Sequence, residues 1–512
     1  MKKFIILFII WAGNLFSQNI IPQPQDYIPL QGSFLLNADT KIIYNEGNIK
    51  DEAEWFAGYI QQASSFALPV ENIPSPGFKR NTITLVYEIL QSAELPPEES
   101  YKLVVTDSNV IISSQGEAGI FYGLQTLRQM LSPDFEYKGP VDKMIDRNIP
   151  ACIIYDYPAF KWRGMLLDCC RHFMSKDFIF RYLDLLALHK MNRFHWHLTE
   201  DQGWRIEIKK YPKLTEIGAF RKEKDGRMYG GFYTQEDIKE VIAYAKKLHI
   251  LVVPEIEMPG HSLAALASYP ELSCTGGPHE VTNQWGVFED VYCAGNEKTF
   301  EFLQDVLDEV ITLFPSKYIH IGGDEVPKTR WEKCDKCNAR LESENLKNYE
   351  ELQSYFIKRI DKYLESKGKI LIGWDEILEG GLSPNAIVQS WRGFEGGLKA
   401  AREKHFVIMS PTSHCYFDYS LDKINLQKVY SFDPIPDGMT DYESTFILGG
   451  ECNMWTERAP QELVDSKIFP RILALTEVLW RYPVNRDYDK FLERVRNHYK
   501  RLEILGVKYG GE

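Results

Sequence analysis

The chain has 512 residues, of which 44% are hydrophobic, enough to build large cores in two or more domains. Its formal net charge is −13 and it has no long basic run, which argues against nucleic acid as a partner. Aromatic residues make up 13% of the chain and 11 are tryptophans, whose faces suit sugar rings, although most tryptophans in proteins lie in cores.

The first residues have the composition of a signal peptide. Lys2 and Lys3 precede an apolar run over residues 4–11, and we expect cleavage near Ser17. This run is too short to span a membrane, and no other stretch qualifies. We therefore predict a signal peptide over 1–17 and an exported protein, periplasmic or extracellular, without a transmembrane segment after cleavage.

The nine cysteines are an odd number, so at least one stays unpaired within the chain. Cys274 and Cys293 flank a loop rich in Gly and Pro and are the best candidates for a disulfide. Cys334 and Cys337 have the spacing of half a zinc ribbon, but the sequence has no second pair with this spacing. A local disulfide or two free thiols is therefore expected there rather than a metal.

Residues 18–157 are expected to form a separate, smaller α+β domain with an antiparallel sheet, because strands turn back locally with helices on one side. The region has no catalytic constellation, so we predict an accessory, structural role. Its predicted elements are strands over 34–44 and 82–89, a helix over 51–65, a hairpin over 101–114 that turns at 107–109, and a helix over 119–131.

From residue 158 onward, apolar strands alternate with amphipathic helices. The predicted strands are 164–169, 193–198, 250–256, 318–322, 370–374, 386–391, 406–410 and 447–452. The predicted helices are 176–188, 235–248, 299–313, 349–366 and 396–403, with 468–479 and 488–505 closing the ring. Eight such strands in one block predict an α/β fold, a (β/α)8 TIM barrel over 158–512.

A TIM barrel carries its functional residues at the C-terminal ends of its strands. Polar and aromatic residues follow every predicted strand, which packing alone does not explain, and this convergence predicts an enzyme. In strand order they are Asp168, Arg171 and His172; Thr199, Glu200 and Asp201; Glu255, Glu257 and His261; Asp324 and Glu325; Trp374, Asp375 and Glu376; Trp391; Tyr416 and Asp418; and Trp455 and Glu457.

The fourth predicted strand ends in Gly322, Gly323, Asp324 and Glu325. Neighbouring side chains of a regular strand face opposite ways, so both carboxylates serve one site only if the glycines bend the chain. Adjacent carboxylates whose pKa values differ suit a glycoside hydrolase. The alternative is that the pair caps the next helix.

Glu325 is the candidate general acid that protonates the leaving oxygen. Asp324, its neighbour, is poorly placed to attack the opposite face of the sugar. In substrate-assisted enzymes the sugar's own 2-acetamido oxygen attacks instead, and Asp324 would then orient that group. A slot walled by Trp374, Trp391 and Trp455 would hold it in an attacking pose.

The histidines allow two interpretations. His195 and His197 have a metal-ligand spacing used in metal-dependent amidohydrolases, but no further lysine and aspartate set completes such a site, so core or supporting histidines are expected. His261 follows the third strand, and we expect it to orient the acid; alternatively it only begins a helix.

With these residues in view, the chain resembles glycoside hydrolase family 20, the β-N-acetylhexosaminidases. The resemblance covers the whole barrel in order, and the leading α+β domain fits the family's accessory domain. The motifs that carry it are residues 162–168 with 171–173, 195–205, 254–261, 320–325, 416–418 and 455–457.

The resemblance implies a retaining, substrate-assisted mechanism without metal or cofactor, in which Glu325 is the acid/base, Asp324 orients the acetamide and Tyr416 binds the acetamide oxygen. It implies further substrate-binding roles. The tryptophans would form the acetamide pocket, and hydroxyls would contact Arg163, Glu457 and Asp418, with Asp201 nearby. Arg163 precedes its strand end, so its assignment rests on the motif alone, and an ordinary salt bridge is the alternative.

Two positions depart from the family pattern. Glu200 stands where the family has the first of two aspartates, and Glu257 where aspartate is frequent. Both changes keep the charge and lengthen the side chain, so we expect them to tune the surroundings of the site.

The predicted function is hydrolysis of terminal non-reducing β-linked GlcNAc or GalNAc from glycans, glycoconjugates or chitooligosaccharides. A lacto-N-biosidase that releases a disaccharide and a non-catalytic glycan-binding protein are the alternatives. The sequence leaves the natural substrate open and is compatible with a monomer or a homodimer.

Overall fold

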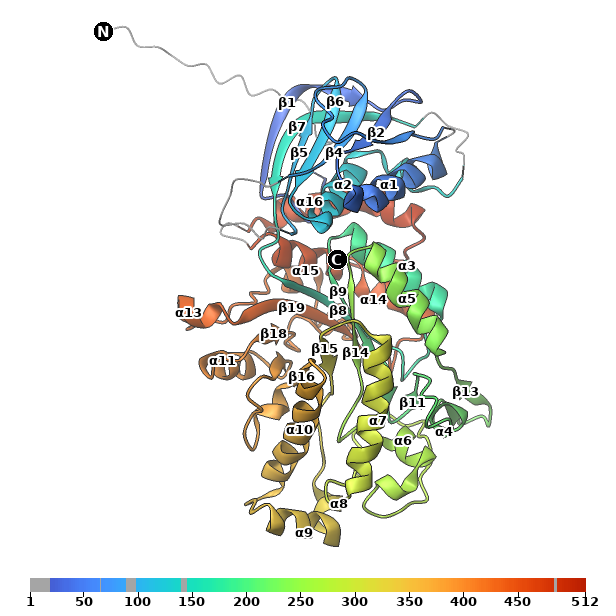
Figure 1. The fold of residues 1–512 in the computed structure, drawn as a ribbon, viewed down its shortest axis with the longest axis vertical. Coiled ribbons are helices and arrows are strands. Elements are labelled where there is room, and N and C mark those ends of the chain that lie inside the picture. The colour runs from blue at the N-terminus through green and yellow to red at the C-terminus, as the bar shows by residue number, and fades with distance from the viewer. Residues whose placement is uncertain (1–18, 65, 89–97, 140–144, 483–485) are drawn as a thin grey trace, which may run out of the picture. The chain divides into compact units, whose positions relative to one another are not determined.

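The computed structural model describes residues 19–64, 66–88, 98–139, 145–482 and 486–512. The chain forms two compact units, one of residues 1–158 with 485–506 and one of residues 159–484 with 507–512 (Figure 1). The predicted signal peptide lies outside the described residues. Among the residues that are described, no helix is both long and apolar enough to cross a membrane.

The first unit is built on a seven-stranded sheet in the order β1-β7-β5-β6-β4-β2-β3. Its strands are β1 (Asp26–Leu35), β2 (Lys41–Tyr44), β3 (Val70–Asn72), β4 (Thr82–Tyr87), β5 (Tyr101–Val105), β6 (Asn109–Ser114) and β7 (Asn148–Asp156). The pairs β1–β7, β7–β5 and β5–β6 are antiparallel, as predicted. The pairs β6–β4, β4–β2 and β2–β3 are parallel. The predicted hairpin is formed by β5 and β6.

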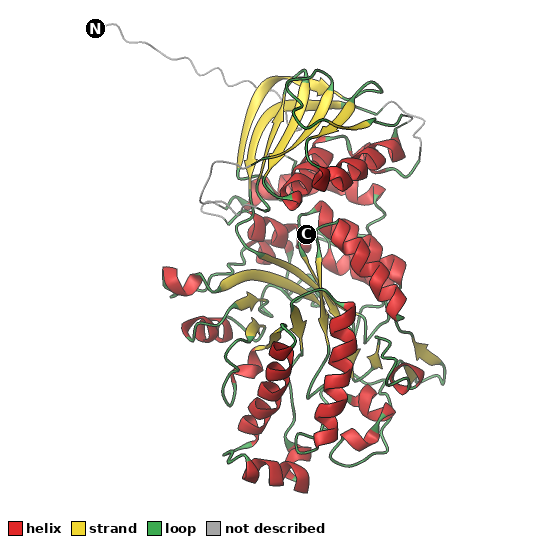
Figure 2. Cartoon of the chain, in the orientation of Figure 1, coloured by secondary structure: helices red, strands yellow, loops and turns green. Residues whose placement is uncertain are grey.

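Three helices lie on one side of this sheet, as the sequence predicted for two of them (Figure 2). They are α1 (Lys50–Ala63), α2 (Glu117–Met130) and α16 (Tyr488–Ile504). The assignment of α16 differs from the sequence-based expectation, which placed this helix in the ring of the barrel. Periodicity shows that a helix has an apolar face, but not which core buries that face.

The second unit is a closed barrel of eight parallel strands, which confirms the predicted fold. Each predicted strand is present, with bounds that differ by a few residues. They are β8 (Trp162–Asp168), β9 (Arg193–His197), β14 (Leu251–Glu255), β15 (Tyr318–His320), β16 (Ile370–Trp374), β17 (Ile387–Ser390), β18 (Val407–Met409) and β19 (Ile447–Met454).

Helices alternate with these strands. The main ones are α3 (Lys176–Leu188), α5 (Gln235–Lys247), α7 (Glu297–Leu313), α10 (Tyr349–Ser366), α11 (Glu395–Arg402), α14 (Gln461–Ile468) and α15 (Arg471–Trp480). Shorter elements of the connecting segments are β10 (Thr199–Glu200), β11 (Gly203–Trp204), β12 (Phe220–Lys222), β13 (Met228–Gly230), α4 (Lys213–Glu216), α6 (Leu263–Ser268), α8 (Thr329–Glu332), α9 (Asp335–Ser343), α12 (Leu426–Tyr430) and α13 (Asp441–Ser444).

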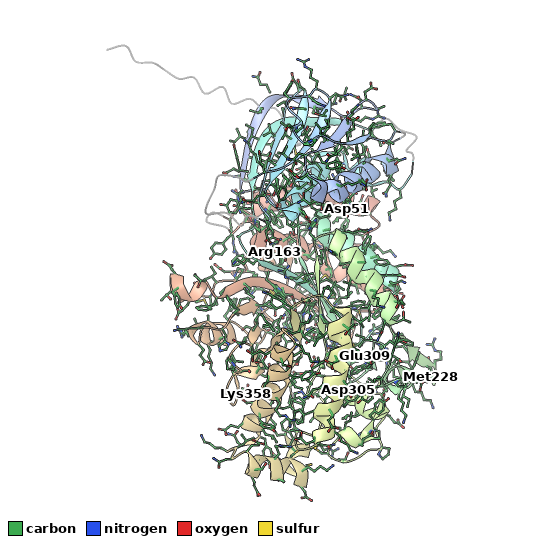
Figure 3. All side chains as sticks on the ribbon, viewed as in Figure 1. Asp51, Arg163, Met228, Asp305, Glu309 and Lys358 are labelled. Carbon is green, nitrogen blue, oxygen red and sulfur yellow. The ribbon has the colours of Figure 1, made fainter. Side chains whose placement is uncertain are left out.

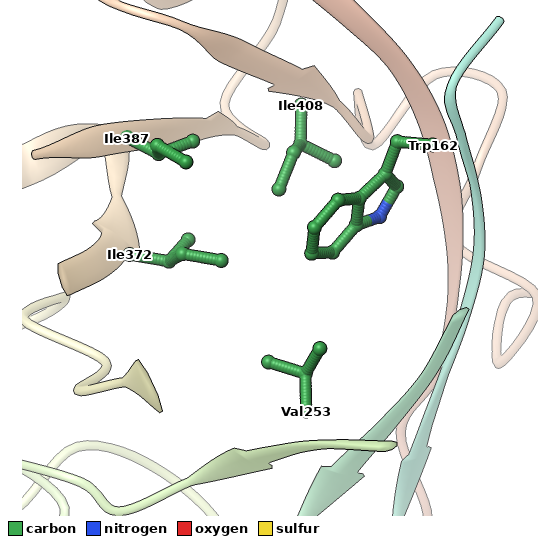
Figure 4. Packing of buried hydrophobic residues seen from close by; sticks show 5 residues of the cluster. All are labelled: Trp162, Val253, Ile372, Ile387 and Ile408. Carbon is green, nitrogen blue, oxygen red and sulfur yellow. The ribbon is translucent and has the colours of Figure 1, made fainter. Parts of the chain in front are cut away.

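The barrel interior has an apolar layer (Figure 4). It is formed by Trp162, Val253, Ile372, Ile387 and Ile408. Residues two apart on a strand face the same side, so two positions toward the C-terminal ends the interior side chains become Glu255 and Trp374. The interior side chains therefore change from apolar ones to polar and aromatic ones toward the C-terminal ends of the strands. These ends are called the rim of the barrel.

Candidate active site

The chain bends sharply where β15 ends. Gly322 and Gly323 have φ angles of 68° and 90°, in the left-handed region that favours glycine. The bend places both following carboxylates beside one nitrogen: His261 Nε2 lies 3.5 Å from Asp324 Oδ2 and 3.6 Å from Glu325 Oε2. The predicted convergence of Asp324 and Glu325 on one site is therefore present.

Close packing also requires glycine at this bend. A Cβ atom on Gly322 would lie 1.6 Å from Glu257 Oε2, and one on Gly323 would lie 2.8 Å from Ile377 Cγ2. Glu325 itself has a φ of 47°, a strained conformation for a non-glycine residue that is frequent at functional sites. The pair does not cap the next helix, because α8 begins at Thr329 with Lys328 as its N-cap.

His261 is buried among carboxylates. Its Nδ1 lies 2.8 Å from Glu200 Oε1 and 3.3 Å from Asp201 Oδ2. Burial alone would lower the pKa of His261, but the neighbouring carboxylates, above all Glu200 and Asp324, raise it well above its usual value. His261 is therefore a protonated bridge between the supporting carboxylates and the Asp324–Glu325 pair.

Asp201 contacts His261 on its Nδ1 side, the side of the ring away from Asp324. Its carboxylate is buried, and Oδ1 accepts a hydrogen bond of 2.9 Å from the backbone N–H of Leu263, where α6 begins. Both oxygens are thus engaged with protein groups. Asp201 therefore holds His261 in place, and its predicted contact with the sugar stays a prediction.

Asp324 and Glu325 differ in their surroundings. The Asp324 side chain is 13% exposed and that of Glu325 is 40% exposed. Asp324 Oδ1 is buried and has no hydrogen-bond partner among the described residues. A buried carboxylate oxygen without a partner is suited to accept a hydrogen bond from a bound ligand.

The predicted aromatic residues lie in contact with one another. Ring centroids are 5.8 Å apart for Trp374 and Trp455, 6.5 Å for Trp455 and Tyr416, and 6.0 Å for Tyr416 and Trp391. Trp391 Nε1 donates to Glu376 Oε2 over 2.9 Å. The four side chains come from the ends of different strands and form one continuous aromatic group.

This aromatic group lies next to Asp324. Burial raises the pKa of Tyr416 well above its usual value, and the negative charge of Asp324 adds to that effect. Burial, followed by the Asp324 and Asp375 carboxylates, raises the pKa of Glu376 to about 8. Glu376 is therefore largely protonated at neutral pH, so little charge opposes Asp324 from that side.

A second acidic pair lies at the ends of β18 and β19. Burial, followed by the Glu457 carboxylate, raises the pKa of Asp418 to about 7. Asp418 Oδ1 is buried and lacks a hydrogen-bond partner within the described parts of the chain. As predicted, Asp418 follows β18 and Glu457 follows β19.

The arginine at this rim is Arg171, not Arg163. An Arg171 nitrogen lies 2.8 Å from Glu200 Oε2, and its guanidinium lies 5.1 Å from the Trp455 ring centroid. Burial alone would lower the pKa of Arg171, but the carboxylates, including Glu457, raise it well above its usual value. Arg171 therefore lies between Glu200 and the Trp455 ring of the aromatic group.

Arg163 lies near the start of β8, and Figure 3 shows it beside α15. Its guanidinium donates to the backbone carbonyls of Lys190 and Phe160, each over 2.8 Å, and lies 5.1 Å from the Trp480 ring centroid. These contacts are structural, so the predicted sugar-binding role of Arg163 is wrong.

The two histidines of β9 face inward, as expected for alternate residues of one strand. His195 lies between carboxylates, with Nδ1 2.7 Å from Glu451 Oε1 and Nε2 3.1 Å from Glu255 Oε2. His197 Nε2 lies 3.4 Å from Glu257 Oε1. Burial, and then the Asp324 and Glu255 carboxylates, raise the pKa of Glu257 well above its usual value.

From the sequence, Arg171 and Glu376 were expected among the polar residues at the strand ends, but neither was given a substrate-binding role. Both follow predicted strands and were visible as polar residues at the rim. Residue type alone did not distinguish these two residues from those that were given a role. Their positions at the ends of the folded strands do.

Sequence profiles of two domains match the chain. The profile described as glycosyl hydrolase family 20, catalytic domain, matches residues 160–483, and the one for domain 2 of the same family matches residues 17–157. A β-hexosaminidase of Porphyromonas gingivalis is 42% identical over 504 residues, which cover 96% of this chain and 64% of that protein. The chain thus spans less than two thirds of this relative.

Solved structures of similar fold agree with the profiles. The exo β-N-acetylglucosaminidase of Vibrio harveyi in complex with N-acetylglucosamine is 30% identical with a TM-score of 0.85, covering 97% of this chain and 78% of that one. A mutant Streptomyces plicatus β-hexosaminidase in complex with its product GlcNAc is 28% identical with a TM-score of 0.84, covering 97% of each chain.

Proposed function

Because the chain belongs to glycosyl hydrolase family 20, we propose that it is an exo-acting β-N-acetylhexosaminidase. Its substrates are glycans, glycoconjugates or chitooligosaccharides with a terminal non-reducing β-linked GlcNAc or GalNAc. The observation that carries this proposal is the pair Asp324 and Glu325 on one histidine nitrogen, next to a continuous aromatic group.

Glu325 acts as the general acid and later as the base. It is the more exposed member of the pair, which suits proton transfer to a leaving sugar and then from an incoming water. The protonated His261 lies beside it and holds the carboxyl group in place. Donation of the proton to the glycosidic oxygen gives a neutral leaving group.

Asp324 orients the 2-acetamido group. Its buried Oδ1 accepts the hydrogen bond of the acetamide N–H, which points the acetamide oxygen at the anomeric carbon. That oxygen attacks as the glycosidic bond breaks, and the anionic Asp324 stabilises the positive charge that develops on the amide. Water then attacks the anomeric carbon from the leaving-group side, so configuration is retained.

The aromatic group confines the acetamide. Trp374, Trp391 and Trp455 surround its methyl group, and the Tyr416 hydroxyl donates to its oxygen. Holding an internal nucleophile in an attacking pose contributes roughly 7–11 kcal/mol in well-oriented systems. Arg171, Glu457 and Asp418 bind the hydroxyls of the terminal sugar. These protein groups suffice for the steps described, and no step is assigned to a metal or cofactor.

A panel of aryl glycosides tests this function. We expect hydrolysis of the GlcNAc glycoside, with the GalNAc glycoside as a second substrate, and very poor hydrolysis of the glucoside, because it has no acetamide to attack. Efficient cleavage of the glucoside would rule out substrate assistance. Preference for the lacto-N-biose glycoside would identify a disaccharide-releasing enzyme, and no cleavage would indicate a glycan-binding protein.

We also propose that the protein is exported through its N-terminal signal peptide. The support is the pair of lysines followed by an apolar run over residues 4–11. N-terminal sequencing of the protein recovered outside the cytoplasm tests this proposal, and a chain that begins at Met1 in the cytoplasmic fraction contradicts it.

A further inference from the structure

Four cysteine side chains converge within the second unit, on two segments that are distant in sequence. Two lie between α6 and α7 and two lie at the start of α9; they are Cys274, Cys293, Cys334 and Cys337. Their Sγ atoms all lie within 4.8 Å of one another. Cys274 is partly exposed and the other three are buried. The sequence showed only the second pair as a metal motif.

The distances within this four-cysteine cluster match those around one tetrahedral metal ion. The Sγ atom of Cys293 lies 3.7 Å from that of Cys334 and 3.6 Å from that of Cys337. The Sγ atoms of Cys274 and Cys337 are 3.7 Å apart. Zinc–sulfur bonds of about 2.3 Å in tetrahedral geometry separate the sulfurs by about 3.8 Å. A disulfide requires about 2.05 Å.

The distances show no preferred disulfide pairing. Cys337 Sγ is almost equally far from Cys274 and Cys293, and Cys293 Sγ is almost equally far from Cys334 and Cys337. All nine cysteines lie within the described residues and are free thiols, so the predicted Cys274–Cys293 disulfide is not formed. Equal spacing is the arrangement that a central ion requires.

The backbone around the cluster is shaped to bring the two segments together. Ser273 and Tyr292 form an antiparallel bridge, which places Cys274 and Cys293 side by side. A Cβ atom on Gly295 would lie 2.1 Å from the Lys336 carbonyl oxygen, so only glycine allows this segment to approach the start of α9.

We propose that one zinc ion binds at the centre of this cluster, held by the thiolates of Cys274, Cys293, Cys334 and Cys337. Four sulfur ligands in tetrahedral geometry favour zinc over harder cations, and a complete set of four protein ligands is typical of a structural site. Each thiol releases its proton to solvent on binding, so the zinc and four thiolates carry a net charge of −2.

The zinc site joins the two segments that carry the catalytic groups. Beside Cys293, the Tyr292 N–H donates to the Pro259 carbonyl over 3.0 Å, two residues before His261. Beside Cys334, Trp331 Nε1 donates to the Tyr292 carbonyl over 2.9 Å, and Trp331 follows Glu325 on the same connecting segment. The ion therefore fixes the segments after β14 and β15 relative to each other.

Metal analysis of the full-length protein tests the proposal. After extensive dialysis, mass spectrometry of metals should find about one zinc per chain, and Cys337→Ala should lower that content about tenfold. Cys152→Ala removes a buried cysteine of β7 outside the cluster and should retain the zinc. Cobalt exchanged into the wild-type protein should show thiolate-to-metal charge-transfer bands in the near ultraviolet.

Three results would overturn the proposal. They are a metal-free chain with two disulfides among these cysteines, four free thiols that do not take up added zinc, and stoichiometric iron with visible colour. If Cys337→Ala does not fold, the zinc content and the cobalt spectrum of the wild-type protein still decide the matter. None of these readouts depends on the proposed glycosidase activity.

Discussion

Two groups of buried carboxylates, one in each unit, have opposite shifts in pKa. In the first unit, Glu136 lies 2.6 Å from an Arg128 nitrogen and also contacts the Arg501 guanidinium. Burial alone would raise the pKa of Glu136, but these two arginines lower it to about 2. At the barrel rim, buried carboxylates lie beside one another, and the pKa values of Glu376 and Asp418 rise to about 8 and about 7.

Buried carboxylates thus have a structural role around Glu136 and a functional role at the barrel rim. A buried carboxylate surrounded by cations is satisfied within the protein and stabilises the fold. Buried carboxylates that crowd together and leave oxygens without partners destabilise the unbound site, and such arrangements cluster where ligands bind. Substitutions in the two regions should therefore have opposite effects on stability and activity.

Asp324→Asn should greatly lower the activity and leave the fold intact. We expect kcat/KM for an aryl GlcNAc glycoside to fall about 10²–10³-fold, because the neutral amide cannot stabilise the charged acetamide in the transition state. The variant should stay folded at the assay temperature, because asparagine keeps the shape of the side chain that it replaces. A variant that loses stability and keeps its activity would contradict this assignment.

Glu136→Gln should give the reverse result in the first unit. It leaves two buried arginines without their carboxylate, and breaking such a pair costs about 3–5 kcal/mol in the free energy of unfolding. Chemical denaturation measures this loss, while kcat at a temperature where the variant is folded should stay unchanged. Glu71→Gln breaks an exposed ion pair with Lys41 in the same unit and is the matched control with little expected effect.

The contribution of Glu136 to stability also depends on pH in a defined direction. Its pKa in the folded chain is about 2, below the unfolded value of 4.5. The stabilisation is therefore present above about pH 4.5 and is lost as the pH falls toward 2. The Glu136→Gln variant should lack this part of the acid sensitivity.

Two matched substitutions, Arg171→Lys and Arg163→Lys, compare an arginine at the rim with an arginine near the start of β8. Arg171→Lys should lower kcat/KM roughly 10–100-fold, because lysine cannot reproduce the planar contacts of a guanidinium with Glu200 and Trp455. Arg163→Lys should leave kcat/KM unchanged and lower the melting temperature by about 2–8 °C, since it loses buried bonds to carbonyls. Equal kinetic losses would contradict the placement of the two arginines.

A further prediction concerns the pH dependence of kcat/KM. The pKa of Asp418 is raised to about 7, so the carboxyl is protonated below that pH and accepts sugar hydroxyls less well. We expect kcat/KM to fall by up to about tenfold per pH unit below 7 through this group. Asp418→Asn should remove that inflection, and an unchanged profile in the variant would exclude Asp418 as its source.

Much of the barrel follows from local sequence. Strands such as Ile370–Trp374 are buried on both faces and read as apolar runs, so their positions could be predicted. The sharp bend at Gly322 was also predictable, because only glycine tolerates it. The site at the strand ends followed from the fold, since a TM barrel collects those ends on one face.

The remaining features depend on contacts between distant segments. Helix α16 is amphipathic, but its sequence does not specify which unit buries it. Arg163 and Arg171 are close in sequence, and only the direction of β8 shows which one reaches the rim. Cys274 and Cys293 have no zinc-ribbon spacing, and their approach to α9 depends on Gly295, whose role is visible only once the segments are folded.

The central claim is that Glu325 supplies the proton and Asp324 supports the acetamide, and the leaving group tests it most directly. In Glu325→Gln, kcat/KM for chitobiose should fall about 10²–10⁴-fold, because a sugar alcohol needs protonation to leave. The same variant should lose far less on a dinitrophenyl GlcNAc glycoside, whose phenolate leaves unaided. Equal losses on both substrates, or near-normal cleavage of chitobiose, would contradict the account.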